Sequence, residues 1–179
     1  LLAGDDDLNA TNVDDYGEPR NSLLPDVLTR RTGLPIALSL VYVEIARALG
    51  LSARGVGFPG HFLVRLDAPD ETEPAVFVDP FGGGGVLGPD ELARRFLQAT
   101  GVSHPEALAA HLAPIEPRSF LQRWLGNLRG AYLKRGELAR ALVVLDRLLD
   151  LQPDDVRTLR ERGLLSYKLG AVAAARADL

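Results

Sequence analysis

The 179-residue chain contains no cysteine and no methionine. Without cysteine it can form no disulfide, no cysteine-ligated zinc site, no iron–sulfur cluster and no thiol nucleophile. Because the chain has no thiol to oxidise, its composition leaves the redox compartment open. The absence of methionine extends to position 1, from which we expect a trimmed or processed segment.

The chain also lacks a long apolar run and a strong charge of either sign. Its longest apolar stretch, Leu34 to Ala46, contains Ser39 and Glu44 and is too short to cross a bilayer. The acidic run at 5–7 is unlike the basic start of a signal peptide. The net charge is only −4, and no basic cluster with interleaved aromatics suggests nucleic-acid binding. We expect a cytoplasmic protein that binds neither membranes nor nucleic acids directly.

Residues typical of metal or phosphate sites are also scarce. The three histidines do not have the spacing of metal ligands, and the run 5–7 lacks the pattern of a calcium loop. Four consecutive glycines, residues 82–85, lack the lysine and hydroxyl residue of a phosphate-binding loop. We expect no cofactor and no metal. The glycines predict a flexible loop that could gate a neighbouring cleft.

Charge divides the chain into two parts. Residues 1–118 hold 17 acidic and 9 basic side chains, for a net charge of −8. Residues 119–179 hold 7 acidic and 11 basic side chains, for a net charge of +4. This shift predicts one domain over residues 1–118 and a differently built segment over residues 119–179.

The hydrophobic periodicity of the first part predicts an α+β fold. A helix over Leu34–Leu49 is apolar around most of its circumference, which is typical of a buried helix. The period then changes to two, which predicts antiparallel strands packed on that helix, over residues 53–58, 62–66 and 75–78. Further helices are predicted over residues 26–32, 89–100 and 105–112.

Beyond Pro117 the chain is predicted to be helical, and it contains an internal repeat. Gly136 and Gly170 are 34 residues apart, as are Ala141 and Ala175. That period, with small residues where helices cross, is typical of tetratricopeptide repeats. The second copy is weaker and stops inside its second helix, so the pair should pack against the first domain or against missing residues. Such helices form grooves for peptide segments, which predicts a protein or peptide partner.

Three features of the first part together suggest chemistry. They are the helix start at Gly33-Leu34-Pro35, His61 before one strand, and Asp79 at the end of the next. A helix start followed by histidine and aspartate on neighbouring strands is the layout of papain-like and transglutaminase-like enzymes. Each residue also has a structural interpretation, because His61 fits a satisfied buried polar residue and Asp79 fits a turn before Pro80.

The order and spacing of several motifs resemble the SirB1 family. The motifs are Asn21-Ser22-Leu23, Gly33-Leu34-Pro35-Ile36, Pro59-Gly60-His61-Phe62, Asp79-Pro80-Phe81 and Arg123-Trp124-Leu125-Gly126-Asn127-Leu128. That family is described as a transglutaminase-like domain followed by tetratricopeptide repeats, and the resemblance covers nearly the whole chain. It implies an α+β, transglutaminase-like (papain-like) core, in which His61 matches the catalytic base and Asp79 the residue that orients it.

The position of the nucleophile does not match this resemblance. A transglutaminase-like enzyme needs a thiolate at the helix start, where the helix dipole lowers the pKa of the thiol. Here the segment reads Leu34-Pro35-Ile36-Ala37, and proline has no nucleophilic atom. The hydroxyls of Ser22, Thr32 and Ser39 are the nearest substitutes in the sequence, which does not place them relative to His61.

We therefore predict a non-catalytic transglutaminase-like protein that serves as a protein-interaction or regulatory module through its helical repeats and a vestigial cleft. The alternative is a hydrolase or acyl-transfer enzyme that uses His61 and Asp79 with a non-cysteine nucleophile or an activated water. A third possibility, implied only by the resemblance, is a regulator of nucleic-acid machinery that acts through protein contacts. The predicted cleft residues are Pro35, Ser39, Phe58 and Phe81.

Overall fold

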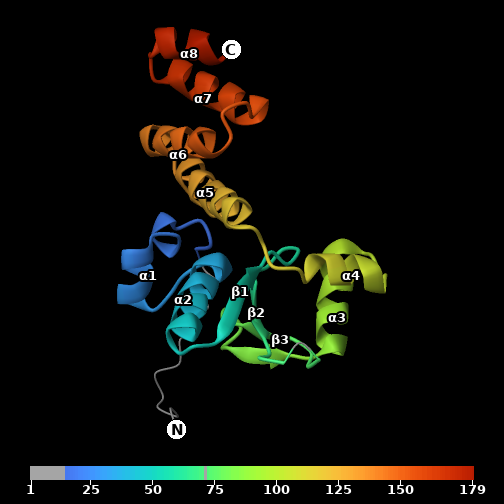
Figure 1. Cartoon of the computed structure of the whole chain (residues 1–179). Helices are drawn as coiled ribbons and strands as arrows, with labels where there is room; N and C mark the ends of the chain where they lie inside the picture. The colour runs from blue at the N-terminus through green and yellow to red at the C-terminus, as the bar shows by residue number, and fades with distance from the viewer. Residues whose placement is uncertain (1–14, 71) are drawn as a thin grey trace.

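The computed structural model describes residues 15–70 and 72–179. Figure 1 shows two differently built halves: a sheet flanked by helices, and a stack of helices that extends away from it. We call residues 15–116 the sheet half and residues 117–179 the helical half. The acidic run at 5–7 lies outside the described residues.

The sheet half begins with two short helical segments, η1 (Pro19–Asn21) and α1 (Leu24–Arg30). The helix predicted over residues 26–32 therefore starts and ends two residues earlier. It starts earlier because Pro25 lies inside the first turn, where its missing N–H costs nothing. It ends earlier because Arg31 adopts a left-handed conformation with φ of 54°.

The central helix α2 (Pro35–Ala48) confirms the prediction to within one residue at each end. Leu34 is its N-cap and Pro35 its first residue, and both are buried. The expectation that α2 is buried all round is wrong at its C-terminal end. There Ile45 is 54% exposed, and Leu49, just beyond the helix, is 74% exposed.

Four antiparallel strands follow in the order β1-β2-β3-β4. The strands are β1 (Ser52–Val56), β2 (Leu63–Asp67), β3 (Val76–Asp79) and β4 (Gly85–Leu87). The three predicted strands are confirmed, whereas β4 was missed because glycine has a low strand propensity. Gly85, expected in the loop, pairs with Asp79 and extends the sheet.

Alternate residues of the strands face opposite sides of the sheet, so both sides are covered by helices. One side packs on α2 in a cluster of Val43, Ala46, Ala53, Val64 and Val78. The other packs on α3 (Pro89–Thr100) in a cluster of Val56, Phe58, Leu63, Leu87, Leu92 and Phe96. The short helix α4 (Pro105–His111) adds to this second cluster. The sheet therefore lies between α2 and the α3–α4 pair (Figure 1).

The helical half consists of α5 (Pro117–Lys134), α6 (Leu138–Leu151), α7 (Val156–Lys168) and α8 (Val172–Asp178). Consecutive helices pack against each other, as Figure 1 shows. Gly136 and Gly170 follow the first helix of each pair with positive φ angles of 71° and 80°. Ala141 of α6 and Ala175 of α8 occupy equivalent places in the second helix of each pair, and both are buried. The predicted 34-residue repeat is confirmed.

The weakness of the second repeat has a structural cause. Tyr132 is buried in the core of the first repeat, whereas Tyr167 is 66% exposed. Ser166, 34 residues after Tyr132, takes the buried position instead. Within the described part of the chain, no helix has the length and apolar character needed to span a membrane.

The helical half packs against the sheet half through one face of α5, as predicted. The Phe120 ring lies edge-on to Phe62 and to Trp124, with centroid separations of 5.3 and 5.4 Å. The Trp124 indole nitrogen donates a hydrogen bond of 2.8 Å to the carbonyl of Ser22. The first repeat helix is thus part of the core of the sheet half.

Candidate functional site

His61 and Asp79 meet at one edge of the sheet. His61 follows the Pro59–Gly60 turn and lies two residues before β2, while Asp79 is the last residue of β3. Because β2 and β3 are antiparallel neighbours, the start of one lies beside the end of the other. The His61 Nε2 and Asp79 Oδ1 atoms are 2.8 Å apart. The structure thus brings together the two residues that the sequence placed on successive strands.

Asp79 is the centre of this polar cluster. Its side chain is only 4% exposed, and its Oδ1 also accepts the backbone N–H of Gly82 at 3.0 Å. Its Oδ2 accepts a hydrogen bond of 2.6 Å from Arg95. Burial alone would raise the pKa of Asp79, but the hydrogen bonds from His61 and Arg95 hold that pKa well below its usual range. Asp79 is therefore a carboxylate at neutral pH.

The glycine run forms a cradle for Asp79. In addition to the Gly82 bond, the N–H of Gly84 donates to the Asp79 carbonyl at 2.8 Å. A Cβ atom at position 82 would lie 2.7 Å from Asp79 Oδ2, so only glycine fits there. Sequence reasoning predicted a loop able to gate a cleft. In the structure, the described contacts of this loop hold the carboxylate in place.

Arg95 of α3 is the residue that the sequence analysis missed. Its guanidinium bridges Asp79 and Glu91, with hydrogen bonds of 2.6 Å to each carboxylate. The spacing of Glu91 and Arg95 on one helix is a visible i,i+4 signal. The contact with Asp79 has no such signal, because it depends on how α3 docks on the sheet.

The His61 ring has one nitrogen available for chemistry. With Asp79 ionised, Nε2–H of the neutral imidazole donates to the carboxylate, which leaves Nδ1 as a proton acceptor. Among residues 15–70 and 72–179, no hydrogen-bond partner is found for Nδ1. The ring lies edge-on to Phe81 with centroids 5.8 Å apart, and the side chain is 20% exposed. The arrangement can accept a proton at Nδ1.

The start of α2 offers no nucleophile to this base. Pro35 occupies the first helical position, and the following Ile36 is 2% exposed. The Ser39 hydroxyl is fully buried and lies 3.4 Å from the Phe62 carbonyl. The Thr32 hydroxyl donates to a backbone carbonyl at 3.1 Å. In the described part of the chain, no serine or threonine hydroxyl bonds to the His61 ring.

The predicted cleft residues thus lie in different surroundings. Phe81 contacts His61, and Pro35 begins the central helix. Phe58 is a core residue whose ring packs against Phe96 at 6.2 Å. The hydroxyl of Ser22, a possible substitute nucleophile, is buried and has no hydrogen-bond partner among residues 15–70 and 72–179. No group of three side chains able to hold a metal ion occurs among the described residues.

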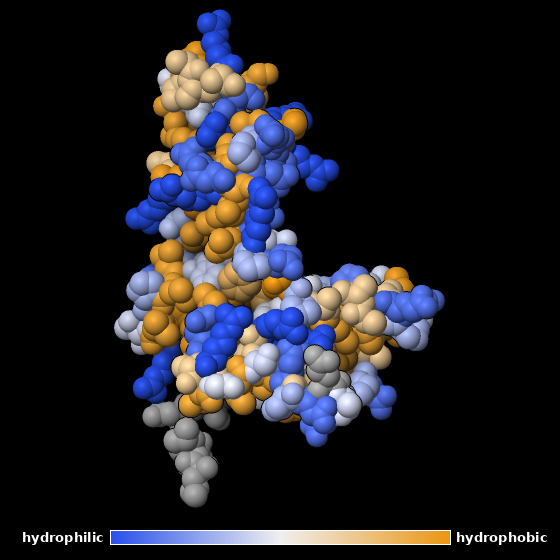
Figure 2. Space-filling model, viewed as in Figure 1, coloured by the Kyte–Doolittle hydropathy of each residue, from blue (hydrophilic) through white to orange (hydrophobic). Residues whose placement is uncertain are grey.

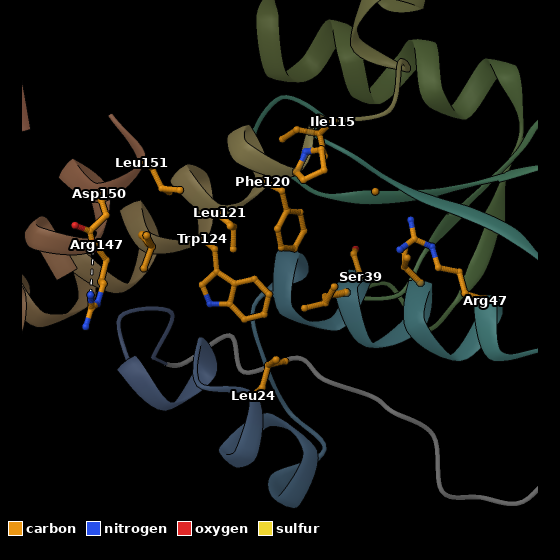
Figure 3. Close-up of a pocket in the computed structure, with 15 residues that line it drawn as sticks. Leu24, Ser39, Arg47, Ile115, Phe120, Leu121, Trp124, Arg147, Asp150 and Leu151 are labelled. Atoms are coloured by element: carbon orange, nitrogen blue, oxygen red, sulfur yellow. Dashed lines mark hydrogen bonds and ion pairs between the residues drawn. The ribbon is translucent and has the colours of Figure 1, made fainter. Parts of the chain in front are cut away.

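A large concave feature lies elsewhere, where the two halves meet. A groove of about 740 Å³ runs between α2, the N-terminal half of α5 and the end of α6 (Figure 3). Arg47 lies at one end, and Arg147, paired with Asp150 at 3.0 Å, lies at the other. Figure 2 shows apolar surface continuing from the sheet half onto the helical half. Among the apolar lining residues are Leu24, Leu40, Val43, Phe120, Leu121 and Trp124.

Of the four predicted cleft residues, Ser39 lines this groove, but the groove as a whole was not predicted. Its walls come from helices far apart in the chain, so no local pattern shows that they face each other. The only visible signal is the pair Phe120 and Trp124, which share one face of α5 because they are four residues apart. That spacing predicts a packed face, and the structure shows that part of it lines the groove.

An antiparallel sheet on a buried helix, a His–Asp pair at the sheet edge, and paired helices at a 34-residue period together define a class: a transglutaminase-like domain followed by tetratricopeptide helices. Residues 6–126 match the family model of the transglutaminase-like superfamily, and residues 128–179 match a tetratricopeptide repeat model. The chain belongs to the transglutaminase-like superfamily.

Several relatives share nearly the whole chain. A UPF0162 protein of Xylella fastidiosa (strain 9a5c) is 43% identical over 94% of this chain and 59% of its own length. A UPF0162 protein of Pseudomonas aeruginosa is 36% identical over 90% of this chain and 57% of its own length. F-box only protein 21 of Homo sapiens is 34% identical over 87% of this chain, which corresponds to 25% of the human protein. No solved structure matches the chain.

The chain spans less than three fifths of the length of the UPF0162 proteins that it matches. The shared region contains both the transglutaminase-like and the tetratricopeptide parts. Tetratricopeptide helices are typical of protein interaction, so the domain content supports a protein-interaction module.

Proposed function

We propose that the protein is a non-catalytic, SirB1-type member of its superfamily that binds a segment of a partner protein in the groove between α2 and α5. The observation that carries this proposal is the residue at the start of α2. Pro35 stands where a transglutaminase-like enzyme requires a thiolate, and it has no nucleophilic atom. By the family resemblance, the base and its orienter are retained, whereas the residue at the helix start cannot attack a carbonyl.

The groove fits an apolar protein segment. Aromatic and aliphatic side chains such as Phe120, Leu121 and Trp124 provide the kind of surface that buries bulky anchors of a partner. The arginines at its two ends, Arg47 and Arg147, are exposed and form surface pairs with Glu44 and Asp150, and a partner's carboxylates can compete for them. We infer a helical or extended segment with two or three bulky apolar side chains flanked by acidic residues.

We propose two domains, residues 1–118 and residues 119–179, which differ in their contribution to partner binding. The net positive charge of residues 119–179 complements an acidic partner segment. A related stretch forms a quarter of the human F-box only protein 21, which supports the idea of a unit that works inside larger proteins. We propose a cytoplasmic location.

Peptide selection tests the proposal without knowledge of the natural partner. A phage-displayed library of random 12-residue peptides is panned on the whole chain, and selected peptides are measured by fluorescence polarisation. We expect Leu121→Glu, at a 47% exposed groove position, to weaken binding at least tenfold. Leu97→Glu, at a 46% exposed position on α3 that does not line the groove, is the matched control and should leave binding unchanged.

His61→Ala separates binding from chemistry in the same assay. Because His61 does not line the groove, its removal should leave the affinity of the peptides intact. Peptides that ignore Leu121→Glu, or that require His61, would contradict the proposal. Failure to select any groove-dependent peptide would also count against it.

The His61–Asp79 geometry favours one second candidate, a hydrolase that activates water. The 2.8 Å contact and the available Nδ1 atom are what a general base requires. Hydrolysis of an activated ester such as p-nitrophenyl acetate, followed with wild type, His61→Ala and Asp79→Asn, tests it. A rate above buffer that both variants abolish would favour the enzyme, whereas equal rates in all three proteins favour the binding module.

A further inference from the structure

Arg123 of α5 reaches across the boundary between the two halves to the backbone around His61. One of its terminal nitrogens, Nη2, donates to the carbonyl of Phe58 at 3.0 Å and also to the carbonyl of His61. Its guanidinium lies over the Phe62 ring, 5.2 Å from the centroid. The other terminal nitrogen lies so close to Gly57 that a Cβ atom there would be 3.1 Å away.

No carboxylate pairs with this cation within the described residues. Burial lowers the pKa of Arg123, since a desolvated charge is less favourable than a hydrated one. A half-buried guanidinium without an acidic partner is costly unless other groups compensate. Here the compensating groups are two carbonyl oxygens and an aromatic face, and all three belong to the segment that carries His61.

The two carbonyls stand at the two ends of one tight turn. The N–H of His61 donates to the Phe58 carbonyl at 3.1 Å, and Gly60 within the turn has a positive φ of 68°. By bonding to both ends, Arg123 fixes the backbone from which the His61 ring projects. Asp79 is fixed separately, by Arg95 and Gly82 of the sheet half.

We infer that Arg123 is the positioning residue of the His61–Asp79 pair. The acid is held by the sheet half and the imidazole by the helical half, so the pair is complete only when α5 is docked. Phe120 and Trp124, which flank Arg123 on α5, line the groove, so the groove and the His61 turn share one helix. This inference concerns the geometry of the pair and does not depend on what occupies the groove.

Nitrogen-15 NMR of the His61 imidazole in the full chain tests the inference. The signal is assigned by its loss in His61→Gln. In wild type we expect one neutral tautomer, protonated at Nε2, with a slowly exchanging proton held by Asp79. In Arg123→Met we expect a mixture of tautomers and exchange of that proton at least tenfold faster. Arg123→Lys, whose ammonium can donate to both carbonyls, should restore most of the wild-type signal.

Arg135→Met is the matched control. Arg135 also links α5 to the sheet half, through Asp15 at 3.0 Å and Glu18 at 3.2 Å, but it does not touch the His61 turn. Its loss should leave the tautomer and the exchange rate unchanged. An unchanged His61 signal in Arg123→Met, or an equal change in both variants, would overturn the inference. If Arg123→Met does not fold, Arg123→Gln replaces it under the same criterion.

Discussion

Two aspartate–arginine pairs, one in each half of the molecule, show how a functional cluster differs from a structural ion pair. Asp79 in the sheet half and Asp178 in the helical half have side chains that are 4% and 5% exposed. Each lies 2.6 Å from an arginine nitrogen, Arg95 and Arg162 respectively. By distance and by side-chain exposure the two pairs are nearly the same.

They differ in which residue of the pair bonds to several partners; we call that residue the hub. In the helical half Arg162 donates hydrogen bonds to both Asp178 and Asp146, and these bonds raise the pKa of Arg162. In the sheet half Asp79 is shared by His61, Arg95 and the Gly82 N–H, which together lower the pKa of Asp79. An arginine hub offers donors only, whereas an acid hub orients an imidazole whose second nitrogen stays available. Only the second arrangement supports acid–base chemistry or a directed hydrogen bond to a ligand.

Removing the aspartate from each pair should give the largest difference in the free energy of unfolding between the two halves. Asp79→Ala leaves His61 and the Gly82 N–H without their acceptor and leaves Arg95 with Glu91 alone, and we expect a loss of about 2–3 kcal/mol in the free energy of unfolding. Asp178→Ala leaves Arg162 with Asp146 and should cost about 1 kcal/mol. Urea unfolding of the full-length variants measures both. Equal losses in the two variants would mean that the number of partners of the aspartate does not affect the free energy of unfolding.

The acid hub also marks the limit of what the sequence could predict. His61 and Asp79 were found because each adjoins a predicted strand, and sequential antiparallel strands must be neighbours. Arg95 was not found, because the sequence does not say which turn of α3 lies over Asp79. Arg123 lies 62 residues after His61 and belongs to a motif at the junction between the two parts, which gives no sign that it contacts the His61 turn.

The elements themselves were predictable where local patterns are strong. The apolar run of α2, the alternating strands and the 34-residue repeat all express a periodicity that packing then confirms. β4 was missed because Gly85 looks like loop and joins the sheet only through its pairing with Asp79. The groove was missed for a similar reason, since its walls are brought together by the docking of α5.

A second comparison concerns Gly82 and Gly163, two glycines at which an added Cβ atom would meet a neighbouring side chain, and it should give a smaller difference in stability. A Cβ atom at position 82 would meet Asp79 Oδ2 at 2.7 Å, and one at position 163 would meet Leu179 Cγ at 2.8 Å. Gly82→Ala should cost about 2 kcal/mol because the carboxylate is fixed by several partners. Gly163→Ala should be close to neutral, because the Leu179 side chain can move and alanine favours the helix by about 1 kcal/mol. Thermal unfolding distinguishes the two, and a neutral Gly82→Ala would show that the acid hub can relax.

Acid should weaken the sheet-half pair through the pKa of Asp79. Because that pKa is lowered in the folded state, the ionised pair contributes stability that is present above the unfolded value of about 3.9 and is lost as the pH falls further. Between pH 7 and pH 3 wild type should lose about 1 kcal/mol more than Asp79→Asn. Glu91, which shares Arg95 with Asp79 and also has a lowered pKa, titrates in both proteins and contributes to the pH dependence of both. Unfolding measured across this range with identical slopes for the two proteins would show that Asp79 is not the titrating group.

The smallest effect on stability is expected at the groove. Arg147 and Asp150 form an exposed pair, with side chains 68% and 64% exposed, so Arg147→Ala should change the free energy of unfolding by less than about 0.5 kcal/mol. If the partner segment carries carboxylates, the same variant should nevertheless weaken the selected peptides severalfold, most strongly at low ionic strength. Peptide affinity that is insensitive to both Arg147→Ala and salt would remove the acidic flanks from the proposed partner while leaving its apolar anchors. A contact that adds almost nothing to folding can therefore still define what the groove selects.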